Sequence, residues 1–308
     1  MPMERRHFMQ LAGAGFAAAG LMSNRAWAQQ AKVKVGMCDW NLGASASPQA
    51  IPKAKEANLD GVQVSVGTNP NNVPLRDPEV IDQYKALCDE HGVQVCSVAA
   101  GGILNSIPLA TEPQSAVYVI EALEAAKELG ATNILMAFFG NGDLRLRDAR
   151  GNTRNISEGP FREYELDSKK VTRVVEVLRQ IAPRAEELGI AMGLENTITA
   201  SQNMEIIERV GSDMLQVYYD VGNSWGNGYN VPAEIRMLGN DRICEIHLKD
   251  WETPLFSSGE GMVDWLSVAE ACDEIGFDKW YVLETSGRDK KFIEDTHDNV
   301  AFAKNMLA

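Results

Sequence analysis

The chain has 308 residues, with 43 acidic against 29 basic side chains and a formal net charge of −14 at pH 7. This acidic balance argues against nucleic acid as a partner, because phosphate backbones are bound by clustered Lys and Arg. Beyond residue 28 no apolar stretch reaches the roughly 20 residues of a membrane-spanning helix, so we expect no membrane contact in the mature form.

The N-terminal segment has the parts of an export signal. Arg5 and Arg6 precede an apolar run over residues 12–22, and Ala26-Trp27-Ala28 forms an A-x-A cleavage pattern. A charged start, a short apolar core and small residues at the cut are typical of a signal peptide. The paired arginines indicate the twin-arginine route. We therefore predict a signal over residues 1–28, passage through the twin-arginine translocase, and a periplasmic or secreted mature protein.

The five cysteines form no C-x-x-C pair and no dense framework; they are Cys38, Cys88, Cys96, Cys244 and Cys272. A scattered, odd-numbered set in a large domain usually consists of small buried hydrophobic residues. We expect no disulfide bond.

From residue 33 onward, short apolar runs rich in β-branched residues alternate with longer helical stretches. The predicted strands are residues 33–40, 61–66, 93–99, 133–139, 190–195, 215–220, 243–249 and 280–284. Predicted helices between them include residues 79–91, 114–129, 168–188 and 263–275. Several of these helices are followed by glycine, which favours the left-handed cap of a helix-to-strand turn. Continuous apolar strands joined by helices predict a parallel sheet covered by helices.

The number of units points to one architecture. Eight strand–helix units over residues 29–308 match the size of a (β/α)8 TIM barrel, an α/β fold. An open doubly wound sheet is the alternative, but no glycine-rich phosphate loop follows the first strand. No linker divides the chain, so we predict a single domain. The connection over residues 141–166 is long and arginine-rich, and the sequence leaves open whether it is a lid or a solvated excursion.

Ionisable residues stand at the ends of four successive predicted strands: Glu195, Asp220, His247 and Glu284. The C-terminal ends of the strands form the functional face of a (β/α)8 barrel. Taken singly, each residue has a structural explanation, such as a hydrogen-bonded core histidine for His247. Three carboxylates in one small volume repel one another unless a cation lies among them. The conjunction therefore predicts a metal site, and its mixed oxygen and nitrogen ligands suit Mn²⁺, Mg²⁺, Co²⁺ or Zn²⁺.

With these residues the chain resembles the xylose isomerase-like superfamily of sugar isomerases and epimerases. Its members include ketose 3-epimerases, hydroxypyruvate isomerases and inosose dehydratases. In the epimerase branch Glu, Asp, His and Glu from strands five to eight hold the metal, which implies that role for Glu195, Asp220, His247 and Glu284. Residues 259–265, GEGMVDW, are similar to the G-E-G-x-x-x-W stretch of the family.

Two positions depart from the ketose 3-epimerase pattern. That branch carries a His three residues after the metal-binding Asp and an Arg six residues after the metal-binding His. Here these positions hold Asn223 and Thr253, so the resemblance leaves the sugar and its binding mode open. Endonuclease IV, a distant member with three zinc ions, needs more histidines than this chain has.

The resemblance implies a divalent-metal-dependent sugar isomerase or epimerase acting on a ketose or keto-sugar. Glu195 and Glu284 would be catalytic, one removing a proton beside the carbonyl and the other returning it, through a metal-stabilised enediolate. A metal-dependent dehydratase or lyase of an inosose or 3-keto-sugar is the alternative, and a non-enzymatic sugar-binding protein is a third hypothesis. A homo-oligomer is left open.

Further residues are assigned to the small-molecule sugar substrate and to the pocket. We expect Trp40, Asn196, Asn223 and Lys249 to bind substrate, while Gln63 is a weaker candidate. Trp251 and Trp265 are candidate pocket walls, although packing at the barrel rim is the favoured interpretation for both. Manganese is the favoured cofactor, because export of a folded protein would let the metal be loaded before periplasmic Zn²⁺ and Cu²⁺ compete.

Overall fold

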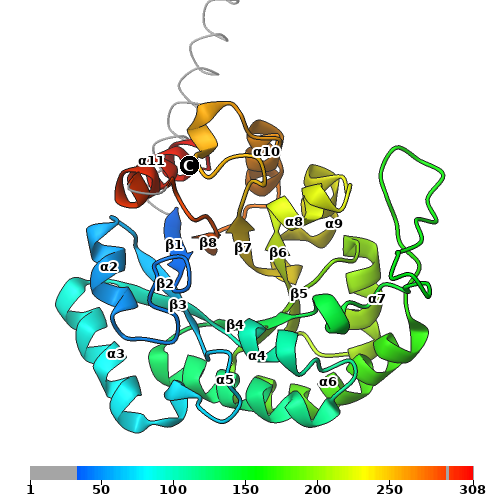
Figure 1. Ribbon diagram of the computed structural model, residues 1–308, viewed down its shortest axis with the longest axis horizontal. Coiled ribbons are helices and arrows are strands. Elements are labelled where there is room, and N and C mark those ends of the chain that lie inside the picture. Colours follow the sequence, from blue (N-terminus) through cyan, green and yellow to red (C-terminus); the bar gives the residue numbers. More distant parts are fainter. Residues whose placement is uncertain (1–32, 289–290, 308) are drawn as a thin grey trace, which may run out of the picture.

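The computed structural model describes residues 33–288 and 291–307, and the predicted signal over residues 1–28 lies outside them. Eight parallel strands close into a barrel in chain order, with β8 beside β1 (Figure 1). The strands are β1 (Lys34–Cys38), β2 (Gly61–Ser65), β3 (Gln94–Ala99), β4 (Asn133–Ala137), β5 (Ala191–Glu195), β6 (Leu215–Asp220), β7 (Ile243–Leu248) and β8 (Trp280–Leu283). The predicted (β/α)8 barrel is confirmed.

Helices surround this barrel and cover the outer face of its strands (Figure 1). They are α2 (Ala50–Glu56), α3 (Pro78–His91), α4 (Gly101–Ser106), α5 (Ala116–Leu129), α6 (Ser168–Leu188), α7 (Ala200–Val210), α8 (Val221–Gly226), α9 (Val231–Arg242), α10 (Trp265–Glu274) and α11 (Phe292–Met306). The apolar core lies between strands and helices, with residues such as Ile51, Leu123 and Ile235 fully buried. Within the described ranges no helix is long and apolar enough to cross a membrane. All five cysteines carry free thiols.

Local signals explain where the elements begin and end. Helix α6 has the predicted bounds, because Asp167 accepts hydrogen bonds from the first backbone N–H groups and Gly189 adopts φ +67° at its end. Strand β1 ends at Cys38, two residues earlier than predicted, because the N–H groups of Asn41 and Leu42 both donate to the Cys38 carbonyl. This turn carries Trp40 to the mouth of the barrel.

The long connection over residues 141–166 forms an arm that projects from the barrel (Figure 1). Short antiparallel bridges join its two limbs, for example between Asn155 and Tyr164. At its base the buried Asp143 carboxylate accepts hydrogen bonds from Arg145, Arg147 and Thr197. No residue of the arm lines the cavity described below, so the arm does not cover the mouth in this structure.

Candidate active site

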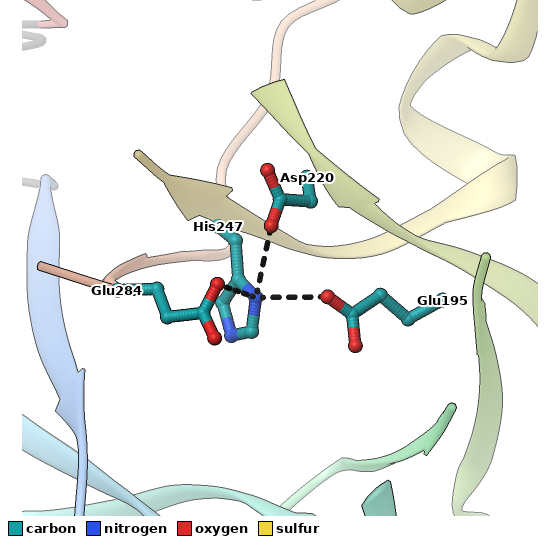
Figure 2. Close-up of side chains that lie close together, drawn as sticks. All are labelled: Glu195, Asp220, His247 and Glu284. Carbon is teal, nitrogen blue, oxygen red and sulfur yellow. Dashed lines mark ion pairs between the residues drawn. The ribbon is translucent and has the colours of Figure 1, made fainter. Parts of the chain in front are cut away.

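Four side chains from the C-terminal ends of β5 to β8 converge at the barrel mouth (Figure 2). They are Glu195, Asp220, His247 and Glu284, and their potential ligand atoms all lie within 4.8 Å of one another. His247 Nδ1 is 3.4 Å from Oε1 of Glu195, 3.8 Å from Oδ2 of Asp220 and 3.9 Å from Oε2 of Glu284. The structure thus brings together all four residues that the strand ends suggested.

The register of the sheet sets this convergence. Asp220 and His247 are paired across β6 and β7, while His247 is paired with Val282 of β8. Because alternate residues of a strand face the same side, Glu284 lies two residues beyond Val282 on the same inward-facing side. Asp220 is also the N-cap of α8, since its Oδ1 accepts a hydrogen bond of 2.7 Å from the backbone N–H of Asn223. Its other oxygen, Oδ2, remains available to the cluster.

The imidazole of His247 is fully buried and held in one orientation. Its Nε2 lies 3.1 Å from Oε1 of Gln63, an acceptor, so this nitrogen carries the proton. The Tyr218 ring and the imidazole pack in a T-shaped arrangement, with ring centroids 4.5 Å apart. Burial acts to lower the pKa of His247, but Cys38, Asp220 and Glu195 more than offset it, and this pKa lies well above its usual value in the metal-free site. A metal ion would displace the second proton from Nδ1, which faces the three carboxylates, and bind the lone pair of the neutral imidazole.

A buried polar network, which we call the polar floor, lies beneath His247 and consists of Gln63, Ser97, Asn133, Tyr218 and Glu245. Gln63 Nε2 donates to Ser97 Oγ at 3.0 Å and to the Tyr218 hydroxyl at 2.7 Å. Both hydroxyls donate in turn to Oε1 of Glu245, and Asn133 donates to its Oε2. Burial raises the pKa of Glu245 even though its oxygens accept these bonds. The hydrogen bonds of the polar floor thus fix the position of Gln63, which in turn fixes the orientation of the His247 imidazole.

The ligand carboxylates differ in their proton affinity. Burial, with Glu284 and Asp220 close by, raises the pKa of Glu195 to about 7. Burial also acts to raise the pKa of Asp220, but His247 and Lys249 more than offset it, and this pKa lies below its usual value. In the metal-free site Glu195 therefore binds a proton more readily than Asp220 does.

The donor set fits a divalent cation. Oδ2 of Asp220 and Nδ1 of His247 are both buried and lack a hydrogen-bond partner, although buried polar atoms are nearly always paired. Three carboxylates and one imidazole form the mixed oxygen and nitrogen set that divalent metals accept. The two unpaired atoms face each other across the cluster, so Glu195, Asp220, His247 and Glu284 can hold a metal ion.

Above the cluster lies a cavity of about 390 Å³, within the range of roughly 300–1,000 Å³ that is typical of small-molecule sites. Its wall includes Glu195 and Glu284, together with three of the predicted substrate-binding residues, Trp40, Asn223 and Lys249. Much of the remaining wall comes from the first half of the barrel, with Ser45, Thr68, Asn105 and Phe139 following β1, β2, β3 and β4.

The remaining expectations for the wall have mixed outcomes. Asn196 does not line the cavity, because its amide donates to Asn203 of α7 at 2.7 Å. Trp265 packs against Phe256 with ring centroids 4.6 Å apart, as expected for a rim residue. Trp251 is 58% exposed and lines the cavity at its edge, so for this residue the pocket-wall alternative agrees better with the structure than packing at the rim alone. The sequence cannot show which way a loop tryptophan faces.

Lys249 is fixed at the cavity by a close-fitting cradle. Its Nζ lies 2.8 Å from Oε2 of Glu284 and 4.7 Å from the centroid of the Trp251 ring. A Cβ on Gly222 would lie 2.7 Å from the Lys249 carbonyl oxygen and 2.9 Å from Lys249 Cγ, so only glycine fits there. The Trp251 indole N–H donates to the Gly222 carbonyl at 2.9 Å. Trp251 and Gly222 thereby hold the lysine from two sides.

Asp250, the next residue, organises the following loop rather than the cavity. Its carboxylate accepts hydrogen bonds from the backbone N–H groups of Met262 and Val263, inside the GEGMVDW segment. A Cβ on Gly261 would collide with this carboxylate, which explains the second glycine of that segment. Thr253 is buried in the same loop and bonds to Leu255, so it does not reach the cavity.

Comparison with known proteins agrees with this architecture. Residues 51–306 match the xylose isomerase-like TIM barrel family, and the chain belongs to that family. The 2-epi-5-epi-valiolone 7-phosphate 2-epimerase of Actinoplanes sp. is 27% identical over 239 residues, which cover 75% of this chain and 79% of the relative.

Solved structures share the fold. The apo form of 3-keto-D-glucoside 4-epimerase from Escherichia coli has a TM-score of 0.68 at 18% identity, with 89% of this chain and 100% of that chain covered. The IOLI protein, solved with a zinc atom, has a TM-score of 0.63 at 14% identity, with 89% and 98% covered. At these identities the two structures bear on the fold alone.

Proposed function

We propose that the protein is a divalent-metal-dependent sugar isomerase or epimerase that moves a proton beside the carbonyl of a ketose or keto-sugar. The protein is an enzyme of the isomerase or epimerase type, related to epimerases that act on sugars. The observation that carries the finer proposal is the cluster of three carboxylates and one imidazole in the wall and base of a small-molecule cavity.

Glu195, Asp220, His247 and Glu284 would hold the metal. When bound, a divalent cation acts as a Lewis acid that stabilises negative charge on the oxygens of the substrate. We favour Mn²⁺, while Mg²⁺, Co²⁺ and Zn²⁺ remain compatible with the same ligands. The IOLI protein, which shares the fold, was solved with a zinc atom, and this agrees with the proposal of a metal.

Two carboxylates would carry the proton transfer. Glu195 is the last residue of β5, Glu284 directly follows β8, and both line the cavity. One removes the proton from the carbon beside the carbonyl, which leaves an enediolate, and the other returns a proton. Return to the opposite face of the same carbon inverts it, whereas return to the neighbouring carbon isomerises the sugar. In the metal-free site burial raises the pKa of Glu195 to about 7. A bound cation would lower this pKa and keep Glu195 ionised, as a proton acceptor requires.

A dehydratase or lyase acting on an inosose or 3-keto-sugar is the second candidate. The observation in its favour is Lys249, whose ammonium lies at the cavity wall 2.8 Å from Glu284 and can donate a proton to a departing hydroxyl. In that reaction the enediolate expels the β-hydroxyl as water, so the product is lighter than the substrate by one water. Mass spectrometry of the product separates the two candidates.

Solvent exchange tests the proposal. The metal-loaded enzyme should incorporate deuterium from D₂O into its substrate, and both Glu195→Gln and Glu284→Gln should lower this exchange by about 10²–10⁴-fold, the usual contribution of a positioned acid or base. Metal content is measured in each variant, and the exposed Glu187→Gln on α6 is the control. Normal exchange in either active-site variant would remove the assigned role.

We also propose export through the twin-arginine route, with residues 1–28 as the signal. A fusion of residues 1–28 to a reporter that folds in the cytoplasm should reach the periplasm only where the twin-arginine translocase is present. The control carries Lys at both Arg5 and Arg6.

A further inference from the structure

We infer that the substrate is an uncharged carbohydrate, without a phosphate or carboxylate group. This inference rests on the proposed function and narrows it to one substrate class. It follows from the charges, the free hydrogen-bonding groups and the aromatic faces of the cavity wall.

The cavity wall holds no spare positive charge. Among the described residues that line it, the single cationic side chain is Lys249. That ammonium is already 2.8 Å from Glu284 and 3.9 Å from Asp220. A divalent cation together with Lys249 balances Glu195, Asp220 and Glu284, so the loaded site has no net charge to attract an anion. A phosphate group, by contrast, is bound by Arg, by Lys or by free backbone N–H groups.

A further carboxylate lies directly behind the wall. Oδ2 of the buried Asp39 accepts hydrogen bonds from the hydroxyl of Ser65, at 3.0 Å, and from the backbone N–H of Ala46, at 2.8 Å. Ser65 and its partner Ser45, at 2.9 Å, both line the cavity. The acceptor behind these hydroxyls makes this side of the wall less favourable for an anion.

The glycines at the wall are explained by packing rather than by phosphate binding. A Cβ on Gly102 would lie 2.7 Å from the carbonyl oxygen of Gly67, and one on Gly101 would lie 3.3 Å from Leu135. Both glycines therefore let the start of α4 approach the loop after β2 and the strand β4. Helix α4 itself has only six residues, too few to make a substantial dipole site.

The polar groups that remain free are neutral. The side chains of Thr68, Asn105 and Asn223 line the cavity and make no hydrogen bond with another described residue. A hydroxyl and two amides can each donate and accept, which is what the hydroxyl groups of a sugar require. Asn223 stands where ketose 3-epimerases carry a histidine, so a neutral amide takes that place here.

Aromatic side chains supply the remaining contact surface. Trp40 and Phe139 line the cavity, and Trp251 stands at its edge with its ring held by the bond to Gly222. Flat apolar rings pack against the C–H faces of sugars, and a tryptophan that is already fixed loses little conformational entropy on binding. Because Trp251 is exposed, its ring contributes little to core packing and is available for contact with a ligand.

Matched pairs of sugars test the inference on the metal-loaded, full-length protein. The pairs are D-fructose with D-fructose 6-phosphate, D-tagatose with D-tagatose 6-phosphate, and methyl 3-keto-glucoside with its 6-phosphate. Binding is measured by saturation-transfer NMR and by titration calorimetry. In the pair that binds, the neutral member should bind at least about ten-fold more tightly, equivalent to about 1.4 kcal/mol. Equal or tighter binding of the phosphorylated member, or binding by no neutral sugar, overturns the inference.

Two variants sharpen this test. Trp40→Ala should weaken binding of the neutral sugar by about ten-fold, as expected from the loss of an aromatic contact. Asn105→Arg should instead reduce the difference in affinity between the phosphorylated and the neutral sugar, because it adds a positive charge that the wall lacks. Phe161→Ala, on the exposed arm, is the control for both. No effect of Trp40→Ala on neutral-sugar binding counts against the inference.

The proposed function fails in a different way from this inference. If neutral sugars bind and none exchanges deuterium, the proposed proton transfer is wrong. The inference then still holds as a statement about which sugars the cavity binds. If a phosphorylated sugar binds more tightly and exchanges deuterium, the chemistry stands and the substrate class is wrong.

Discussion

The ammonium of Lys249 lies 2.8 Å from Oε2 of Glu284, an oxygen that is also 3.9 Å from His247 Nδ1. One carboxylate oxygen therefore faces both a fixed cation and the centre of the ligand cluster. Burial acts to lower the pKa of Lys249, but Asp220 and Glu284 more than offset it, and this pKa lies above its usual value. The lysine stays charged and shares in neutralising the ligands.

Removal of this charge should separate metal binding from substrate turnover. Lys249→Met keeps most of the side-chain volume and removes the cation. We expect metal affinity to stay the same or rise, because one positive charge beside the cluster is lost, while kcat/KM falls by about ten-fold or more. Calorimetric metal titration and steady-state kinetics measure the two effects, with the exposed Lys85→Met as control. Loss of metal would contradict this assignment.

The hydrogen bond from His247 to Gln63 should set metal affinity from beneath the site. Gln63→Leu removes the acceptor that keeps the proton on Nε2, so Nδ1 is no longer the fixed lone-pair donor. Loss of such an outer partner typically lowers metal affinity by about 10–100-fold. The control is Gln94→Leu, at the exposed start of β3. Unchanged affinity in Gln63→Leu would show that the polar floor does not orient the histidine.

Gly222→Ala should displace Lys249 and destabilise the fold. The added Cβ would lie 2.7 Å from the Lys249 carbonyl oxygen, which is backbone and cannot turn aside. Overpacking of this kind costs about 1–3 kcal/mol. The matched control is Gly159→Ala on the arm, where a Cβ meets no atom within 4 Å. Thermal unfolding of both variants checks the difference. Equal unfolding midpoints would show that the contact between Gly222 and Lys249 leaves room for a Cβ.

Glu234 should make stability depend on pH. This buried carboxyl accepts hydrogen bonds from the Ala200 N–H and the Tyr219 hydroxyl, and burial raises its pKa to about 7 from 4.5. Between those values the folded state holds a proton that the unfolded chain has released, so stability falls as pH rises through this window. In wild type this loss in the free energy of unfolding reaches up to about 3 kcal/mol above pH 7, and Glu234→Gln should remove it. Urea unfolding at pH 5 and pH 8 measures it, with the exposed Glu90→Gln as control. If the free energy of unfolding changed with pH by the same amount in wild type and in Glu234→Gln, the prediction would be refuted.

Metal binding should raise the melting temperature. The folded state assembles four ligands that the unfolded chain scatters, so a ligand at one hundred times its Kd stabilises the fold by about 2.7 kcal/mol. Chelation should lower the midpoint of wild type, and Asp220→Asn should remove most of that difference. Calorimetry with and without Mn²⁺ checks this, and the absence of any shift in wild type would argue against the metal centre.

The barrel and the clustering of the four side chains at its mouth were predictable from the sequence for one reason. A parallel strand with both faces covered is a continuous apolar run, so a carboxylate or histidine that terminates it is conspicuous. Glu195, Asp220 and Glu284 each stand at such an end. The closed barrel then places those ends at one mouth without further information.

The polar floor and part of the wall were not predictable in this way. Gln63, Ser97 and Glu245 lie inside strands, and only the closed barrel shows that they meet across its interior. The direction of a loop side chain depends on contacts distant in sequence, as Asn196 and Trp251 show. The alternation of Gln63 with apolar neighbours was the one available signal of an interior polar residue.

The division of the cavity between the two halves of the barrel has a consequence for descent within the family. The candidate metal ligands lie at the ends of β5 to β8, whereas Trp40, Thr68, Asn105 and Phe139 follow β1 to β4. Substitutions in the first four loops would change the wall around the sugar while Glu195 and Glu284, the proposed proton-transfer groups, stay in place. A first half-barrel taken from a relative would still have to suit Asn223, Lys249 and Trp251, which line the cavity from the second half.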